Sequence, residues 1–305
     1  MKSITQKAYS AAILYACIIG LSFLFVKIAL TSANPVDLLA HRFTVSFVAA
    51  LLLYPFLRKK YRFSFHWRDL AIIAPLAIFY PILFFGFQVW GLTFTSSSEA
   101  GIIQASIPIF TMILASLFLK ERSTWRQKAF TVLSVAGVVL LFVMNGIDMQ
   151  ASHMTGSLLI FLSALASSAY SVFARALTRR FHVFELTWIM TILGFVSFNL
   201  ITLIQHSSNG TTSQFFMPFT DGSFIWAVLY LGIFSSLVTS FLSNYALSIL
   251  EAAKMSSFTN LSAFITMAAG AIILHESIYA YHIFGALMIV VGVIGSNFSK
   301  QIKSV

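Results

Sequence analysis

The chain contains ten apolar runs of about 20 residues each, separated by short polar turns. A run of that length spans the ~30 Å hydrocarbon core of a bilayer as one helix. In lipid, every backbone N–H and C=O group must be bonded within the protein, so helices are the expected secondary structure. The expected spans are residues 8–30, 36–57, 69–92, 99–119, 127–145, 155–175, 185–205, 223–247, 256–274 and 280–299. The sequence therefore predicts an all-α membrane protein with ten transmembrane helices.

The composition excludes an ordinary soluble protein. Of the 305 residues, 59% are hydrophobic and 9% are charged, whereas charged residues make up about a quarter of a soluble domain. The first apolar run, from Ala8, is too long for the apolar core of a signal peptide, so we expect it to remain as a span. The single cysteine, Cys17, lies inside that run, which rules out internal disulfides and cysteine-based metal or iron–sulfur sites.

The basic residues predict the orientation of the chain. Cytoplasmic loops of membrane proteins hold most of the Lys and Arg residues. With ten spans and a cytoplasmic N-terminus, 17 of the 19 basic residues fall on the cytoplasmic side, and only Lys27 and Arg42 do not. We therefore expect both termini in the cytoplasm. The net charge of +10 is explained as an orientation signal, with no nucleic-acid partner.

One long segment returns 155 positions later, which indicates an internal duplication. Residues 95–137 and 250–292 share a pattern of two apolar runs joined by a short polar turn. Identical pairs are Thr111/Thr266, Met112/Met267, Leu119/Leu274, Glu121/Glu276, Val135/Val290, Gly137/Gly292 and Val138/Val293. Because each half has an odd number of spans, five, the second half must be inverted relative to the first. The expected repeats, 1–147 and 148–305, would be related by a two-fold axis in the membrane plane.

Several motifs resemble the EamA-type transporters of the drug/metabolite transporter superfamily. In the first half they are Gly20–Lys27, Asn34-Pro35, His41–Phe43, Thr95–Gln104, Pro108 and Leu119–Arg122. In the second half they are Asn244–Ala246, Glu251–Ala253, Leu274–Glu276, Gly285 and Gly292. The resemblance implies ten helices and solute transport, usually export of amino acids, related metabolites or drugs across the bacterial plasma membrane.

The sequence departs from this pattern at two positions. Ala263 stands where the family often has a proline equivalent to Pro108, and Phe130 stands where a glycine equivalent to Gly285 is usual. Because proline bends helices, we expect the chain to bend at Pro108 and to be straighter at Ala263.

Uncharged polar and aromatic residues within the spans are candidates for a solute pocket. Tyr80, Phe84 and Gln88 recur at i, i+4 and i+8, which places them on one face of a regular helix. Other candidates are Gln104, the hydroxyl stripe Ser163, Ser167 and Ser171 with adjacent Tyr170, and the amides Asn244 and Asn260. A pocket with aromatic walls and a few polar groups suits a small amphipathic solute. Helix packing is the alternative role for each residue.

Three charged residues have two interpretations each. Arg42, within the second span, either meets a substrate carboxylate or pairs with Asp37 or Glu99. Lys27 either contributes to gating at the outer side or extends to the lipid headgroups. Glu99 is either a proton-coupling carboxylate or part of a capping box with Ser96. Glu121 and its repeat equivalent are expected to shape their turns.

These observations predict a secondary transporter that moves a small organic solute by alternating access, and we expect export. No Asp or Glu lies in the middle of a span, which weakens the case for direct proton coupling without excluding it. Neither phosphate-binding loops nor hydrolase or metalloprotease motifs occur, so no enzymatic activity, metal or cofactor is expected. A passive facilitator or channel and a lipid flippase stay open as alternatives. Expected partners are the small-molecule substrate and the lipid bilayer, for either a monomer or a homo-oligomer.

Overall fold

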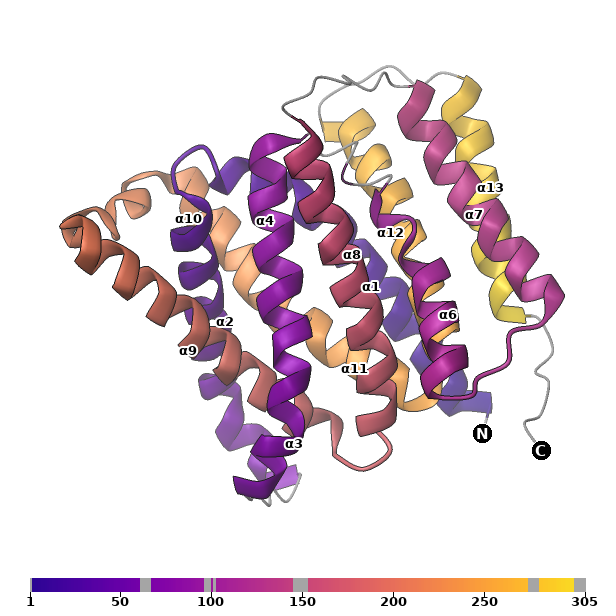
Figure 1. Ribbon diagram of the computed structural model, residues 1–305, viewed down its shortest axis with the longest axis horizontal. Coiled ribbons are helices and arrows are strands. Elements are labelled where there is room, and N and C mark those ends of the chain that lie inside the picture. Colours follow the sequence, from indigo (N-terminus) through magenta and orange to yellow (C-terminus); the bar gives the residue numbers. More distant parts are fainter. Residues whose placement is uncertain are drawn as a thin grey trace.

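The computed structural model describes residues 2–60, 67–95, 100, 103–144, 153–273 and 280–298, and all regular elements among them are helical (Figure 1). Six helical stretches are long and apolar enough to cross a membrane: Ile4–Ala29, Pro35–Phe56, Asp69–Phe94, Met154–Leu177, Val183–Asn209 and Gly222–Ile249. Two shorter apolar helices lie at Ile107–Phe118 and Ile283–Asn297. The predicted all-α membrane protein is confirmed at this level.

The elements follow one another in a similar order in the two parts of the chain. The first part contains α1 (Lys2–Ala29), α2 (Pro35–Lys60), α3 (Trp67–Ala77), η1 (Ile78–Leu83), α4 (Phe84–Phe94), α6 (Ile107–Phe118) and α7 (Trp125–Met144). The second contains α8 (His153–Leu177), α9 (Val183–Asn209), η2 (Thr212–Gln214), η3 (Met217–Thr220), α10 (Gly222–Leu229), η4 (Tyr230–Val238), α11 (Thr239–Ile249), α12 (Ala252–Ile273) and α13 (Ala280–Phe298).

Two of the long stretches contain an irregular middle section. The stretch from α3 to α4 passes through η1, where Tyr80 has extended backbone angles, φ −146° and ψ 118°. Tyr80 precedes Pro81, and a residue before proline is sterically excluded from the helical region. Pro81 also lacks the N–H that would continue the helical hydrogen bonding. The stretch from α10 to α11 has a corresponding irregular section, η4.

The helices containing Pro108 and position 263 differ as expected. A turn at Ala105 and Ser106 interrupts the first, and α6 then begins with Pro108 in its first turn. Its counterpart α12 continues from Ala252 to Ile273 without a break. Glu99 and Glu276 lie outside the described residues.

The helices form a single bundle in which distant segments pack together (Figure 1). Helix α1 packs on α11 and α12, and α8 packs on α4 and α6. Helices α2 and α9 contact each other, and α7 lies along α13 at one end of the bundle.

Glycines allow close packing of α7 on α13. A Cβ atom at Gly137 would lie 2.8 Å from the carbonyl oxygen of Gly285, and one at Gly292 would lie 2.6 Å from the backbone nitrogen of Ser134. Phe130 lies over Gly295, where a Cβ would meet its ring at 2.3 Å. The bulky Phe130, which stands where the resemblance implies a glycine, is thus accommodated by the missing side chain at Gly295.

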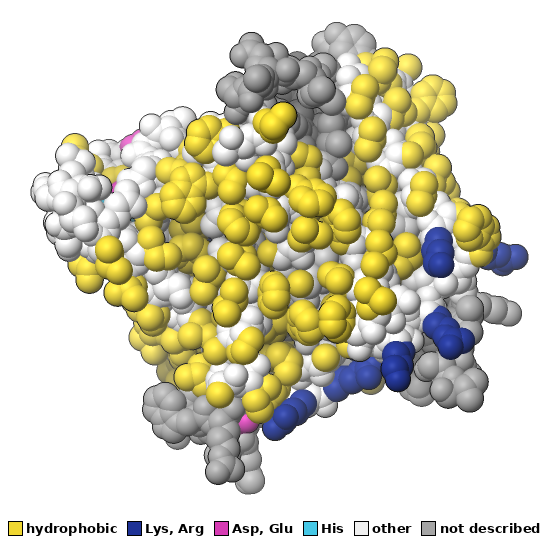
Figure 2. Space-filling model, viewed as in Figure 1, with side chains coloured by type: hydrophobic (Ala, Val, Ile, Leu, Met, Phe, Trp, Pro, Cys, Tyr) yellow, Lys and Arg dark blue, Asp and Glu magenta, His cyan; other side chains and the backbone are white. Residues whose placement is uncertain are grey.

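The surface separates apolar from charged side chains (Figure 2). Hydrophobic side chains cover much of the face in view, and Leu52, Leu117 and Leu203 are among the exposed hydrophobic residues of the chain. Lys and Arg gather along the lower and right edge of the view, where α1 begins and α13 ends in Figure 1. We call this edge the terminal side. An apolar surface of this extent is what a lipid environment requires.

On the side of the bundle opposite the terminal side, a buried polar network joins α2, α9 and the segment between α9 and α10. His206 Nε2 lies 2.9 Å from Asp37 Oδ1, which joins α9 to α2. Asn34 Nδ2 donates to the other Asp37 oxygen at 2.7 Å. His41 Nε2 lies 2.8 Å from the Phe215 carbonyl oxygen, and the two rings stack. These contacts give the buried Asp37 and His41 the partners that buried polar groups need.

Candidate functional site

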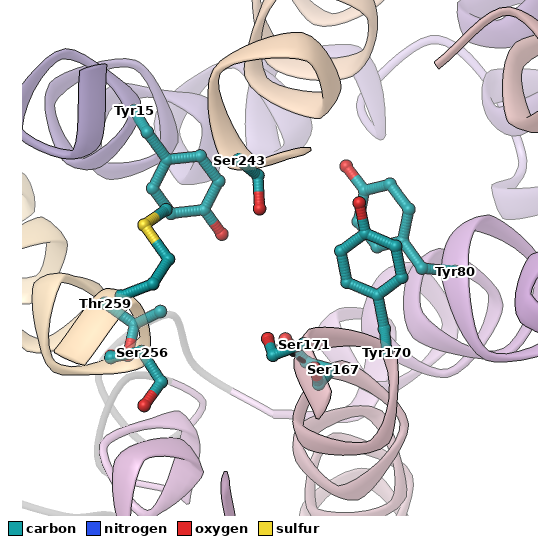
Figure 3. A pocket seen from close by; sticks show the side chains of 9 residues that line it. Tyr15, Tyr80, Ser167, Tyr170, Ser171, Ser243, Ser256 and Thr259 are labelled. Carbon is teal, nitrogen blue, oxygen red and sulfur yellow. Dashed lines mark hydrogen bonds between the residues drawn. The ribbon is translucent and has the colours of Figure 1, made fainter. Parts of the chain in front are cut away.

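A pocket lies between helices from both parts of the chain. It is lined by Tyr15 of α1, Tyr80 of η1, Ser167, Tyr170 and Ser171 of α8, Ser243 of α11, and Met255, Ser256 and Thr259 of α12. Its empty volume is about 360 Å³, including its opening. Figure 3 shows Tyr80 and Tyr170 side by side on one wall and Tyr15 across the open centre. Ligand sites typically combine apolar walls with a few polar groups, and this lining has both.

The aromatic wall is held by stacking and hydrogen bonds. The Tyr80 and Tyr170 rings stack with centroids 4.6 Å apart. The Tyr170 hydroxyl donates to Asn244 Oδ1 at 2.8 Å, and Asn244 Nδ2 donates to Thr187 Oγ1 at 3.2 Å. This chain of bonds joins α8, α11 and α9, so it fixes the orientation of Tyr170.

Four of the residues predicted to line a solute pocket, Tyr80, Ser167, Tyr170 and Ser171, line this one. Phe84 and Gln88 are buried but are absent from its described lining. The spacing i, i+4, i+8 places residues on one face only in a regular helix. The extended backbone at Tyr80 breaks that regularity, which explains why these three residues do not line one surface together.

The predicted amide residues, Asn244, Gln104 and Asn260, are absent from the described lining of the pocket. Asn244 supports the wall from behind, as described above. Gln104 precedes α6, and its buried Nε2 has no hydrogen-bond partner in the described part of the chain. Asn260 Nδ2 donates to Ser134 Oγ at 3.0 Å, which joins α12 to α7. In the hydroxyl stripe, Ser163 donates to the Phe84 carbonyl oxygen at 3.1 Å and therefore packs α8 on α4.

Arg42 is buried within the bundle, with 1% of its side chain exposed. Its Nε donates to Ser236 Oγ at 2.7 Å, and its Nη2 donates to the Ser235 carbonyl and Oγ at 3.2 and 2.9 Å. The guanidinium carbon lies 4.0 Å from the centre of the Phe85 ring. Arg42 belongs to α2 and the two serines to η4, so these bonds join distant parts of the chain.

Lys27, in the last turn of α1, contacts the end of a second helix, α4. Its Nζ donates to the carbonyl oxygens of Leu92 and Thr95, at 3.2 and 3.3 Å, where α4 ends. A cation at this position is favoured by the unpaired carbonyl groups and by the helix dipole. This contact gives Lys27 a structural role.

On the terminal side, Glu121 connects three elements. Its Oε2 accepts a hydrogen bond from the Ala252 N–H at 3.2 Å, where α12 begins, and its Oε1 lies 3.6 Å from Arg175 Nε of α8. Arg175 Nη1 donates to the Leu247 carbonyl oxygen at 2.5 Å. Burial and then the nearby Glu251 raise the pKa of Glu121 above its usual value, while Arg175 opposes this shift. Glu121 therefore links α6, α8 and α12, beyond the turn it was expected to shape.

Sequence reasoning did not include Tyr15, Ser243, Met255, Ser256 or Thr259 among the candidates, although all line the pocket. Three of them follow or precede quoted motifs: Ser243 adjoins Asn244, and Met255 and Ser256 follow Glu251–Ala253. Their positions near motifs in two separate helices were the available signal. Tyr15 lies among the small residues of α1, and only the packing of α1 on α12 brings it to the pocket.

Comparison with known proteins identifies the family. The model described as the EamA-like transporter family matches residues 6–143 and again residues 154–298. The chain belongs to the EamA-like transporter family. The resemblance drawn from the motifs is confirmed, and the protein is a multi-pass transporter of the plasma membrane.

Individual relatives agree with this assignment. The chain is 56% identical over 297 residues to the uncharacterized transporter YcxC of Bacillus subtilis (strain 168), covering 97% of this chain and 95% of the relative. It is 28% identical to an S-adenosylmethionine uptake transporter of Rickettsia conorii (strain ATCC VR-613 / Malish 7), over 68% of this chain and 66% of the relative. A solved structure titled "Crystal structure of protein" has the same fold, with a TM-score of 0.76, 18% identity and coverage of 98% of this chain and 99% of that chain.

Proposed function

We propose that this EamA-like transporter is a secondary transporter that exports a small organic solute, an amino acid or a related metabolite, by alternating access. The observation that carries the proposal is the pocket, because its lining comes from both parts of the chain. α1 and η1 contribute Tyr15 and Tyr80, and α8, α11 and α12 contribute the other lining residues. Relative movement of the two parts would therefore change access to the pocket.

We further propose that residues 1–147 and 148–305 are inverted repeats with five spans each. The helix contacts support this arrangement because the most extensive ones correspond between the two halves. The packing of α1 on α12 corresponds to that of α8 on α6, and the packing of α1 on α11 corresponds to that of α8 on α4. The pairs α2 with α9 and α7 with α13 are each self-equivalent. In Figure 1, α1 and α8 start at opposite sides of the bundle.

In this proposal the terminal side is cytoplasmic, since Lys and Arg gather there (Figure 2). Contacts that join the halves on that side would break and form again as the pocket opens and closes. The Glu121–Arg175 pair and the bond from Ala252 N–H to Glu121 are such contacts. Inverted repeats allow either direction of transport; export follows the resemblance to the family. The relative named as an S-adenosylmethionine uptake transporter supports a small metabolite as substrate.

Counterflow in proteoliposomes tests this function. Vesicles loaded with a panel of unlabelled amino acids, related metabolites and drugs are given the labelled solute, with and without a pH gradient. A carrier takes up label transiently against its gradient, whereas a passive pore only equilibrates it. We expect counterflow with one solute class, and dependence on the pH gradient would indicate proton coupling.

Variants connect the flux to the pocket. Tyr170→Ala removes the stacked ring and should reduce counterflow about tenfold or more, because such rings contribute strongly to ligand contact. Phe56→Ala is the matched control, because it removes an aromatic ring that is 75% exposed. Simple equilibration of label, or full counterflow in Tyr170→Ala, would contradict the proposed carrier pocket.

A further inference from the structure

Arg42 is a buried cation whose counter-charge is absent from the described part of the chain. It is the largest of the fully buried side chains there. Its neighbours are two serines and a phenylalanine, and none of the described carboxylates lies within ion-pair distance. The third guanidinium nitrogen, Nη1, donates no hydrogen bond to a described residue. Burying an uncompensated charge is expensive, so such residues inside membrane proteins commonly serve a ligand or ion path.

Arg42 lies directly behind the aromatic wall of the pocket. Its guanidinium covers one face of Phe85, and the Phe85 and Tyr80 ring centroids are 5.0 Å apart. Tyr80 in turn lines the pocket. In this low-dielectric interior, a positive charge acts over a longer distance than it would in water. The pocket wall formed by Tyr80 is therefore at positive potential.

The Tyr80 hydroxyl is available as a donor. It is buried and makes no geometrically satisfied hydrogen bond to a described residue, although Thr239 of α11 lies close enough to interact with it. Buried hydroxyls normally have partners, and unpaired ones beside a pocket indicate groups that bind a ligand.

We propose that Tyr80 and Arg42 form a subsite for the carboxylate of the solute. The Tyr80 hydroxyl donates a hydrogen bond to the carboxylate, and Arg42 supplies the compensating charge from behind. Arg42 is thus a positioning residue that acts through Tyr80. This inference rests on the proposed transport function and adds the chemical group that the pocket recognises.

Other hydroxyl groups of the pocket have the complementary polarity. Ser171 donates its hydroxyl proton to Ser167 O at 3.0 Å, Ser256 donates to Ala253 O at 3.1 Å, and Thr259 donates to Ser256 O at 2.6 Å. With their protons engaged within their own helices, these oxygens are left as acceptors. Acceptors suit an ammonium group, so α8 and α12 complement a carboxylate subsite at η1 in binding a zwitterion.

Ligand-induced stabilisation tests the subsite. The thermal unfolding midpoint of the purified protein is measured with each of the standard L-amino acids and with their primary amides, which lack the negative charge. We expect at least one acid, and not its amide, to raise the midpoint. In Tyr80→Phe the ring stack remains and only the hydroxyl is lost, so affinity for that acid should fall about tenfold.

Charge variants separate recognition from folding. Arg42→Lys keeps the charge and should keep the preference for the acid over the amide, whereas Arg42→Met should abolish it. Arg180→Met, which removes an exposed cation, is the control and should bind like the wild type. Equal stabilisation by acid and amide, an unchanged preference in Tyr80→Phe, or no stabilisation by any acid would each overturn the subsite. Counterflow with a neutral or cationic solute would still uphold the carrier, so the two proposals fail separately.

Discussion

Glu121 is a carboxylate in the turn between α6 and α7 that reaches the start of α12 and Arg175 of α8. Because its pKa is raised, chiefly by burial, the folded protein binds this proton more tightly than the unfolded chain does. The associated stability is present below the ordinary pKa of about 4.5 and is lost as pH rises through the raised value. Glu121→Gln removes this dependence but keeps an oxygen for the Ala252 N–H.

We therefore predict that the unfolding midpoint of Glu121→Gln rises relative to wild type as pH increases above about 4.5, and then levels off. The measurement is thermal unfolding of both proteins across pH. Asp221→Asn is a control of opposite sign. Hydrogen bonds from Ser32 and Ser223 lower the pKa of Asp221, so wild-type stability from this group is lost as pH falls. If the midpoint of Glu121→Gln instead falls relative to wild type as pH rises, the attraction between Arg175 and the Glu121 carboxylate exceeds the effect of burial.

Single residues were predictable from sequence where local rules determine them. The sequence indicated Tyr80 and Tyr170 as pocket candidates, and both rings stack on one pocket wall. The i, i+4, i+8 spacing predicted that Phe84 and Gln88 share a face with Tyr80, and this holds only in a regular helix. Pro81 signalled the disturbance, but its effect on the direction of each side chain depends on the packing around η1.

At the scale of the elements, α7 and α13 approach closely through glycine. Gly292→Ala would place a Cβ 2.6 Å from the Ser134 backbone nitrogen and 2.7 Å from the Phe130 carbonyl oxygen. Backbone atoms cannot yield as a flexible side chain can, so we predict a loss of about 1–3 kcal/mol in the free energy of unfolding. Denaturant or thermal unfolding measures it.

Gly86→Ala is the matched control, since a Cβ there has no described atom within 4 Å. It should be neutral or slightly stabilising, because alanine favours helix more than glycine does. Equal effects of the two substitutions would mean that contact between α7 and α13 does not constrain Gly292. The register of Gly137 with Gly292 was visible in the sequence as a repeat. The contact of Phe130 with Gly295 could not be predicted from the sequence, because it depends on how two distant helices cross.

At the scale of the whole molecule, the apolar runs were sufficient to predict a helical membrane protein, and the motifs were sufficient to predict its family. The pocket was predicted less completely. Its lining combines Tyr15 with residues more than 150 positions away in sequence, and hydrophobic periodicity does not specify which faces of different helices meet. Only the packing of α12 against α1 and α8 brings Ser256 and Thr259 to the pocket.

The proposed inverted arrangement predicts opposite sides for two exposed positions. With a cytoplasmic N-terminus, four spans precede Lys120 and seven precede Ser208, so the first lies inside and the second outside. Each is replaced by cysteine in a Cys17→Ser background, which removes the native thiol. A membrane-impermeant maleimide should label Ser208→Cys in intact cells and Lys120→Cys only after permeabilisation. The reverse result would invert the orientation. Labelling of both from one side would contradict the span count, because an odd number of spans, three, separates the two positions in the proposed topology.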